Sequence, residues 1–266
     1  MDAEEYRREY ERQVDAVSRR RSPPAGPDTA GPGARELVAT MRDGSRSVAV
    51  RLAAIDAGSV IALARSSVMR ALLALLADVD EDPAVRSAAL RALAQAAFSR
   101  AEFRRWEPDY RAALRAVATG DDDELRDAAL ERLALEGDEY AQRLLAEGLR
   151  DPSMALVAPA RALQLLGHDV HAEHYPLLRD LVETSSTKAV RRTALRLLAA
   201  DGDATDLFER IAADRSEDPV ARSTSAVALQ SLAPERFDDV ARRIDDGDDR
   251  RVRATFANAI ANRADG

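Results

Sequence analysis

The chain has 266 residues, of which 46% are hydrophobic and only 4% aromatic, so alanine, leucine and valine must form most of its core. No apolar run approaches the roughly 18 residues that a membrane-spanning helix needs, and the acidic N-terminus lacks the apolar stretch of a secretory signal. The absence of cysteine excludes disulfides, thiolate catalysis and cysteine-ligated zinc, and a net charge of −8 argues against general nucleic-acid binding. We therefore expect a cytoplasmic protein that binds neither membranes nor nucleic acid.

The first 33 residues predict a helix and a linker. Residues 1–21 are expected to form an amphipathic helix, because Tyr6, Tyr10 and Val14 recur every four residues. Residues 22–33 contain four prolines and three glycines, which predicts a linker without regular structure. The helix either folds back over the first part of the following domain or docks on a partner.

From residue 34 onward, one helical pattern recurs. Its clearest copy is Asp82-Pro83-Ala84-Val85-Arg86-Ser87-Ala88-Ala89-Leu90-Arg91-Ala92-Leu93, in which a turn precedes a helix with five apolar positions on one side. Related copies begin near residues 50, 125, 155, 190, 221 and 252. Each of these trailing helices is preceded by a predicted leading helix, at 34–41, 67–77, 109–118, 138–148, 172–183, 204–213 and 235–244. Residues 34–266 are thus predicted to form seven helix pairs, which must stack to bury their apolar faces.

Units of 30 to 40 residues carrying Asp-Pro-x-Val-Arg-x-x-Ala-x-x-Ala-Leu resemble HEAT repeats, in particular the short bacterial repeats similar to phycobilisome-lyase HEAT-like proteins. The resemblance implies an all-α fold, a right-handed superhelical α-solenoid of about seven two-helix repeats. It also implies macromolecule binding on a concave face lined by the trailing helices.

Acidic turn residues precede several trailing-helix arginines by about four positions. The expected pairs are Asp82 with Arg86, Asp218 with Arg222, and Asp248 or Asp249 with Arg253. We interpret them as structural, a ladder that satisfies turn amides and links neighbouring repeats.

The trailing-helix pattern also predicts which side chains point away from the core. Counted from the first apolar residue of each pattern, the third and seventh positions face outward. The candidate partner-binding residues at these positions are Arg91, Glu131, Arg161, Arg192 and Arg196, and Asp56 occupies the seventh position of the first copy. Arg161, Arg192 and Arg196 form a local basic group that suits an acidic protein or peptide. The alternative is a polar face that is only solvated.

Aromatic residues gather where the repeat spacing stretches to 40 residues. Phe103, Trp106 and Tyr110 fall in this insertion. They form either a second binding surface, since tryptophan and tyrosine are common interface anchors, or a plug between stacked helices.

The three histidines of the chain, His168, His171 and His174, lie within seven residues of one another. They are weak candidates for metal ligands, because a spacing of three residues spreads them around a helix instead of aligning them. Polar residues at a helix end are the preferred interpretation, and no cofactor is expected.

No catalytic constellation or phosphate-binding glycine loop is evident in the sequence. We therefore expect a non-enzymatic scaffold that binds a protein or peptide through the concave groove, the aromatic insertion or both. The alternatives are a HEAT-like bilin lyase and, less consistent with the acidic composition, a HEAT-like DNA glycosylase or nucleic-acid-binding protein. The His-Glu pairs of HEAT-type deoxyhypusine hydroxylases do not occur in this sequence.

Overall fold

The computed structural model describes residues 32–264 and shows an all-α protein, because these residues form helices and turns but no strand. The predicted helix at 1–21 and the linker up to residue 31 lie outside the described residues. The last two linker residues, Pro32 and Gly33, instead begin the first described helix. Proline suits this position because its fixed φ and missing N–H match the first turn of a helix.

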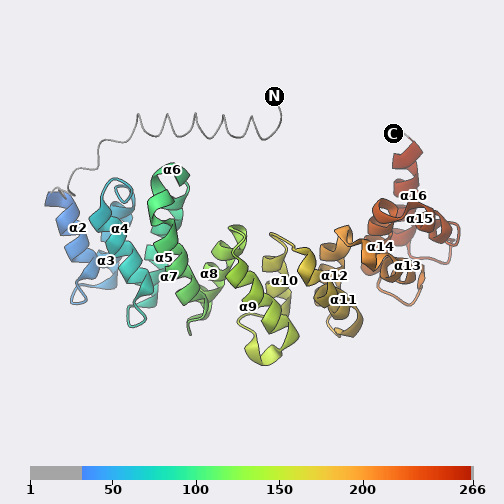
Figure 1. Cartoon of the computed structure of the whole chain (residues 1–266), viewed down its shortest axis with the longest axis horizontal. Coiled ribbons are helices and arrows are strands. Elements are labelled where there is room, and N and C mark those ends of the chain that lie inside the picture. The colour runs from blue at the N-terminus through green and yellow to red at the C-terminus, as the bar shows by residue number, and fades with distance from the viewer. Residues whose placement is uncertain (1–31, 265–266) are drawn as a thin grey trace. The chain divides into compact units, whose positions relative to one another are not determined.

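Longer helices alternate between leading and trailing positions, as the sequence pattern predicts (Figure 1). The leading helices are α2 (Pro32–Arg42), α4 (Ser66–Ala77), α7 (Glu107–Ala118), α9 (Glu139–Arg150), α11 (Tyr175–Thr184), α13 (Thr205–Ala213) and α15 (Pro234–Ala241). The trailing helices are α3 (Val48–Ser59), α5 (Pro83–Ala97), α8 (Asp123–Leu135), α10 (Pro159–Leu166), α12 (Lys188–Leu197), α14 (Pro219–Leu232) and α16 (Arg250–Ala264). Shorter pieces are α6 (Arg100–Phe103) and the 3-10 helices η1 (Arg104–Trp106), η2 (Pro152–Met154), η3 (Ala172–His174), η4 (Leu198–Ala200) and η5 (Gly202–Ala204).

The chain divides into two compact units, here called unit 1, which ends at Ala129, and unit 2, which begins at Leu130. In unit 1, α3 packs against α2 and α5, and α4 packs against α2, α5 and α7. In unit 2, α12 packs against α10, α11 and α14, and α14 packs against α13, α15 and α16 (Figure 1). The trailing helices α3, α5, α10, α12 and α14 therefore each contact their own leading helix and at least one neighbouring trailing helix. Among the helices of residues 32–264, none is sufficiently long and apolar to cross a lipid bilayer.

The apolar face predicted for the trailing helices is confirmed in α5. Val85, Ala88, Ala89, Ala92 and Leu93 are all buried. The adjacent leading helix α4 contributes larger side chains, with Val68, Met69, Leu72 and Leu76 fully buried. Full burial of one such large side chain stabilises the fold by about 1.5–3 kcal/mol. Small side chains on the trailing helix facing large ones on the leading helix allow the two helices to pack closely.

The bounds of the predicted leading helices differ from the structure by at most two residues, except at two ends, where they differ by three. The helix expected at 172–183 starts at Tyr175, after the 3-10 turn η3, and the one expected at 235–244 ends at Ala241. Pro159 begins α10, where a proline is tolerated because the first turn of a helix has no hydrogen bond for its missing N–H to make. On α9, Gly148 allows the backbone at Ala155 to approach closely, because a Cβ at Gly148 would lie 2.8 Å from the Ala155 Cα.

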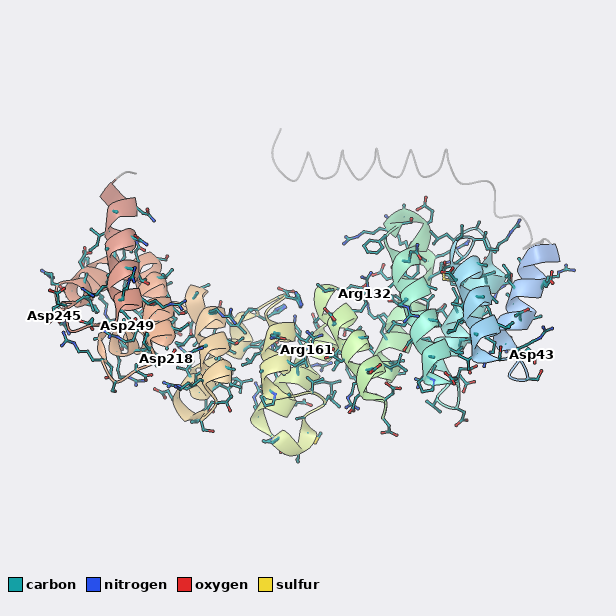
Figure 2. The ribbon with its side chains drawn as sticks, turned by 180° about the vertical axis from the view of Figure 1, so that it is seen from behind. Asp43, Arg132, Arg161, Asp218, Asp245 and Asp249 are labelled. Atoms are coloured by element: carbon teal, nitrogen blue, oxygen red, sulfur yellow. The ribbon has the colours of Figure 1, made fainter. Side chains whose placement is uncertain are left out.

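Aspartates begin several trailing helices by capping the free N–H groups of the first turn. The Asp82 carboxylate accepts a hydrogen bond from the Ala84 N–H at 2.8 Å, and Asp218 accepts one from the Ala221 N–H at 3.1 Å. Asp249 accepts one from the Arg251 N–H at 2.8 Å. Asp218 and Asp249 thereby start the neighbouring helices α14 and α16 (Figure 2).

The arginine that follows the first apolar residue of a trailing helix bonds back to the leading helix of the same pair. Its Nε donates to a carbonyl oxygen near the end of that helix. The donor and acceptor residues are Arg51 and Met41 (2.8 Å), Arg86 and Leu76 (3.3 Å), Arg191 and Val182 (2.8 Å), and Arg222 and Ala212 (3.0 Å). These four residues, here called the bridging arginines, satisfy carbonyl groups that the end of a helix leaves without a partner.

Three bridging arginines also reach the turn of the next pair. Arg51 pairs with Glu81 and lowers the pKa of that carboxyl group. Arg191 holds both carboxylate oxygens of Glu217, at 2.8 and 3.1 Å. Such bidentate contacts are strong because the planar guanidinium matches a carboxylate in shape and charge. The bridging arginines therefore connect successive helix pairs within each unit.

The third connection is buried. Arg222 lies 2.8 Å from the Asp248 carboxylate, and both side chains are at most 3% exposed. Burial raises the pKa of Asp248, but the hydrogen bond from the Asp245 N–H and the Arg222 and Arg215 guanidiniums outweigh it and lower the pKa overall. The Asp248 carboxylate is therefore charged near neutral pH and balances the buried guanidinium of Arg222.

These contacts correct the predicted pairing of acids with arginines. Asp218 pairs with Arg192 instead of Arg222, and Asp248 pairs with Arg222 instead of Arg253. Arg253 pairs with Asp246. The reason is the direction of the side chains: the capping aspartate turns toward its own helix, while the bridging arginine extends toward the next turn.

The ladder is interrupted at Arg86. This residue is buried, but no acid pairs with it within residues 32–264. The corresponding acid of the next turn, Asp121, is exposed. The interruption coincides with the insertion of α6 and η1 between α5 and α7 in the chain.

We predict that Asp248→Asn will lower the free energy of unfolding by about 3 kcal/mol, because breaking a buried ion pair leaves an uncompensated charge on Arg222. Urea denaturation at pH 7 measures the change. The matched control is Asp246→Asn, which removes the exposed pair with Arg253 and should cost at most about 0.5–1 kcal/mol. Equal effects of the two substitutions would contradict a structural role for the buried pair.

Candidate functional site

A cavity of about 460 Å³ lies between the trailing helices α3 and α5 of unit 1. Its floor is apolar, because the lining residues Ile55, Ala88 and Ala92 are buried. Alanine at positions 88 and 92 leaves unfilled the space that larger side chains would occupy. The cavity thus results from the same small residues that bring the trailing helices together.

Two opposite charges line this cavity, Asp56 on α3 and Arg91 on α5. Both side chains are exposed. Among the residues that the structure describes, neither the Asp56 carboxylate nor the Arg91 guanidinium has a hydrogen-bond or ion-pair partner. Arg91 was predicted as a site residue. Asp56 was not, although its position in the pattern of α3 corresponds to that of Arg91 in α5.

The other predicted residues of the outward face lie in unit 2, and their side chains bond to neighbouring side chains. Arg161 on α10, which Figure 2 labels, pairs with Glu131 at 3.0 Å. Arg192 holds Asp218 through two contacts, at 2.7 and 2.9 Å, and lowers the pKa of Asp218. Arg196 is exposed and donates to the Thr193 hydroxyl at 3.2 Å. Carboxylates therefore neutralise two of the three arginines expected to form a basic group for an acidic partner.

The three aromatic residues proposed as a binding surface are buried. Trp106 is 8% exposed, Phe103 4% and Tyr110 1%. The rings of Phe103 and Tyr110 meet edge to face at a centroid distance of 5.4 Å, and Arg105 lies over the Trp106 ring. Their burial favours the second of the two interpretations, a plug between helices, over a binding surface. The sequence places these residues in the insertion but does not show which way they point.

The histidines do not converge on one point. His168 and His171 are exposed, whereas His174 in η3 is buried. His171 lies 3.2 Å from Asp169, and His174 Nε2 lies 3.4 Å from the Gln142 side-chain oxygen. Within residues 32–264, no group of three or more histidine, aspartate or glutamate side chains is arranged to hold a metal ion. Gln142 also donates to the Asp169 carbonyl at 3.1 Å, so His174 belongs to a polar contact between α9 and the segment before α11.

We predict that Trp106→Ala will lower the free energy of unfolding by about 3–5 kcal/mol, because it removes a large buried side chain and leaves a cavity. Urea denaturation measures the loss. Val79→Ala is the control, since Val79 is 76% exposed and should change stability by no more than about 0.5 kcal/mol. A Trp106→Ala protein of wild-type stability would contradict the role of this residue as a plug.

The buried His174 predicts a pH dependence of stability. Burial lowers its pKa below the ordinary value of 6.5, so the unfolded chain binds a proton more readily than the folded one. The contribution of His174 is complete above pH 6.5 and is lost as the pH falls below that value. We expect His174→Gln to reduce the fall in unfolding free energy between pH 7 and pH 5, as measured by urea denaturation, whereas His168→Gln at an exposed position should leave it unchanged. If the unfolding free energy fell equally between pH 7 and pH 5 in the wild type and in both variants, His174 would not be the source of the pH dependence.

Comparison of the chain with models of protein families and with curated proteins finds no match.

Proposed function

We propose that the chain is a HEAT-like α-solenoid of seven helix pairs that acts as a non-enzymatic, cytoplasmic scaffold and binds a segment of another protein. The alternation of leading and trailing helices supports this assignment, as does the repeated arginine that bonds to its own pair and, in three cases, to the next. Helix pairs that bury their apolar faces only by stacking are typical of solenoids, and solenoids commonly bind partners along an extended face.

The cavity between α3 and α5 is the observation that carries the proposal. Its volume of about 460 Å³ falls within the range of 300–1,000 Å³ typical of binding pockets. It also combines an apolar floor with a few polar groups, an arrangement that provides both contact area and orientation. The trailing helices that line it correspond to the surface on which HEAT-like proteins are expected to bind.

The aromatic insertion is the weaker candidate surface. Phe103, Trp106 and Tyr110 are buried and offer little area to a partner. The basic group predicted in unit 2 is likewise reduced by the pairs Arg161–Glu131 and Arg192–Asp218. We therefore place the partner on unit 1, over α3 and α5.

Site-specific photo-crosslinking tests this placement. A benzophenone amino acid at Gln95, which is exposed and lines the cavity, should capture a discrete protein from native lysate. The same group at Ala74, an exposed position on the leading helix α4, should not capture that protein. Mass spectrometry identifies the crosslinked peptide on both sides. Capture of the same species from both positions, or from neither, would contradict a binding surface over α3 and α5.

A further inference from the structure

We propose that the cavity between α3 and α5 recognises a peptide segment with one basic and one acidic side chain, the basic one at Asp56 and the acidic one at Arg91. This inference rests on the proposed function and specifies the chemistry of the partner. Its basis is that two opposite charges line one apolar cavity and are both unpaired within the described part of the chain.

The remainder of the ladder shows how unusual these two charges are. Several arginines on trailing helices hold a carboxylate, as Arg51 holds Glu81, Arg191 holds Glu217 and Arg192 holds Asp218, whereas Arg86 and Arg196 bond to a carbonyl and a hydroxyl. These ion pairs connect one helix pair to the next. Asp56 and Arg91 have no such role, so they are available to a partner without any loss of internal contacts.

A second pair in the same chain provides an internal comparison. Glu131 on α8 and Arg161 on α10 occupy the positions that correspond to Asp56 on α3 and Arg91 on α5. Glu131 and Arg161 meet at 3.0 Å and pair with each other. Asp56 is one methylene shorter than Glu131. Asp56 and Arg91 do not pair with each other, and the cavity lies between their helices. The shorter acid thus leaves both charges and the apolar floor accessible.

A peptide of mixed charge suits this arrangement better than a segment of one charge. A guanidinium prefers a carboxylate, which it binds with two parallel hydrogen bonds, and the Asp56 carboxylate prefers an ammonium or guanidinium. A wholly acidic segment would be attracted by Arg91 and repelled by Asp56. A wholly basic segment would be attracted by Asp56 and repelled by Arg91. Apolar side chains between the two charges would contact Ala88, Ala92 and Ile55. Charge complementarity of this kind selects partners by penalising the wrong sign.

Fluorescence anisotropy with defined peptides tests the inference on the full chain. The probes are fluorescein-labelled peptides of eleven residues, built on alanine and leucine, with Lys and Glu, Lys and Lys, or Glu and Glu separated by two to four residues. At low ionic strength, at least one Lys–Glu peptide should bind about tenfold more tightly than both like-charged peptides of the same spacing. Equal binding of all three kinds, or binding of none, would overturn the inference.

Variants of the two charges sharpen the test. Asp56→Asn and Arg91→Gln should each weaken the best peptide by about tenfold, while Glu131→Gln, the matched change in the closed pair, should have no effect. The double variant Asp56→Arg with Arg91→Asp should prefer the peptide with Lys and Glu in reversed order. If the double variant preferred the same order of Lys and Glu as the wild type, residues 56 and 91 would not recognise the charges of the peptide.

Asp56→Glu tests the explanation for the open cavity. The added methylene should allow a pair with Arg91 like that of Glu131 with Arg161, and peptide binding should fall by about tenfold or more without loss of stability. Wild-type affinity in this variant would contradict the argument from side-chain length.

The two proposals fail separately. If crosslinking at Gln95 captures a partner but no mixed-charge peptide is preferred, the binding surface stands and the proposed partner chemistry is wrong. If the peptides bind as expected but no protein is captured, the peptide site stands and the scaffold function loses its support.

Discussion

Three of the four bridging arginines, Arg51, Arg191 and Arg222, connect one helix pair to the next. One side of each guanidinium satisfies a carbonyl at the end of its own leading helix, and the other holds an acid in the following turn, as with Arg191 between Val182 and Glu217. Both ends of the contact would be costly to leave unsatisfied, since helix ends carry free carbonyl groups and a half-buried guanidinium needs an anion. The arginine therefore fixes the position of a helix pair against its neighbour more specifically than a core of alanine and leucine does.

This division of roles explains the composition of the trailing helices. Because polar contacts at the turns set the spacing of the pairs, the helices between them can carry small residues such as Ala88 and Ala92, which permit close contact. Small residues also leave gaps where no larger side chain from a neighbour fills them. The cavity between α3 and α5 is such a gap. Its apolar floor follows from the way the helix pairs pack, and its charged side chains come from the outward positions of the same helices.

Much of the fold could be predicted from the sequence, since the apolar periodicity that buries Val85, Ala89 and Leu93 is a local property of the chain. The partner of each charge could not be predicted in the same way. Sequence distance favours Asp82 with Arg86, but the rotamers of both residues direct them elsewhere, Asp82 to a helix N–H and Arg86 to the Leu76 carbonyl. The burial of Trp106 was likewise undetermined, because an insertion is compatible with an exposed loop and with a plug.

Unlike the buried apolar positions, the outward positions of the trailing helices are not determined by the fold, and this difference bears on function. No core contact constrains them, so acid and base vary from pair to pair: Asp56 and Arg91 in unit 1, Glu131 and Arg161 in unit 2. A difference of one methylene between Asp56 and Glu131 is negligible for the fold, yet it accompanies an open pair in one place and a closed pair in the other. Specificity in a repeat protein can therefore reside in side-chain length at exposed positions, where stability imposes little constraint and a partner's charges can be matched independently of the core.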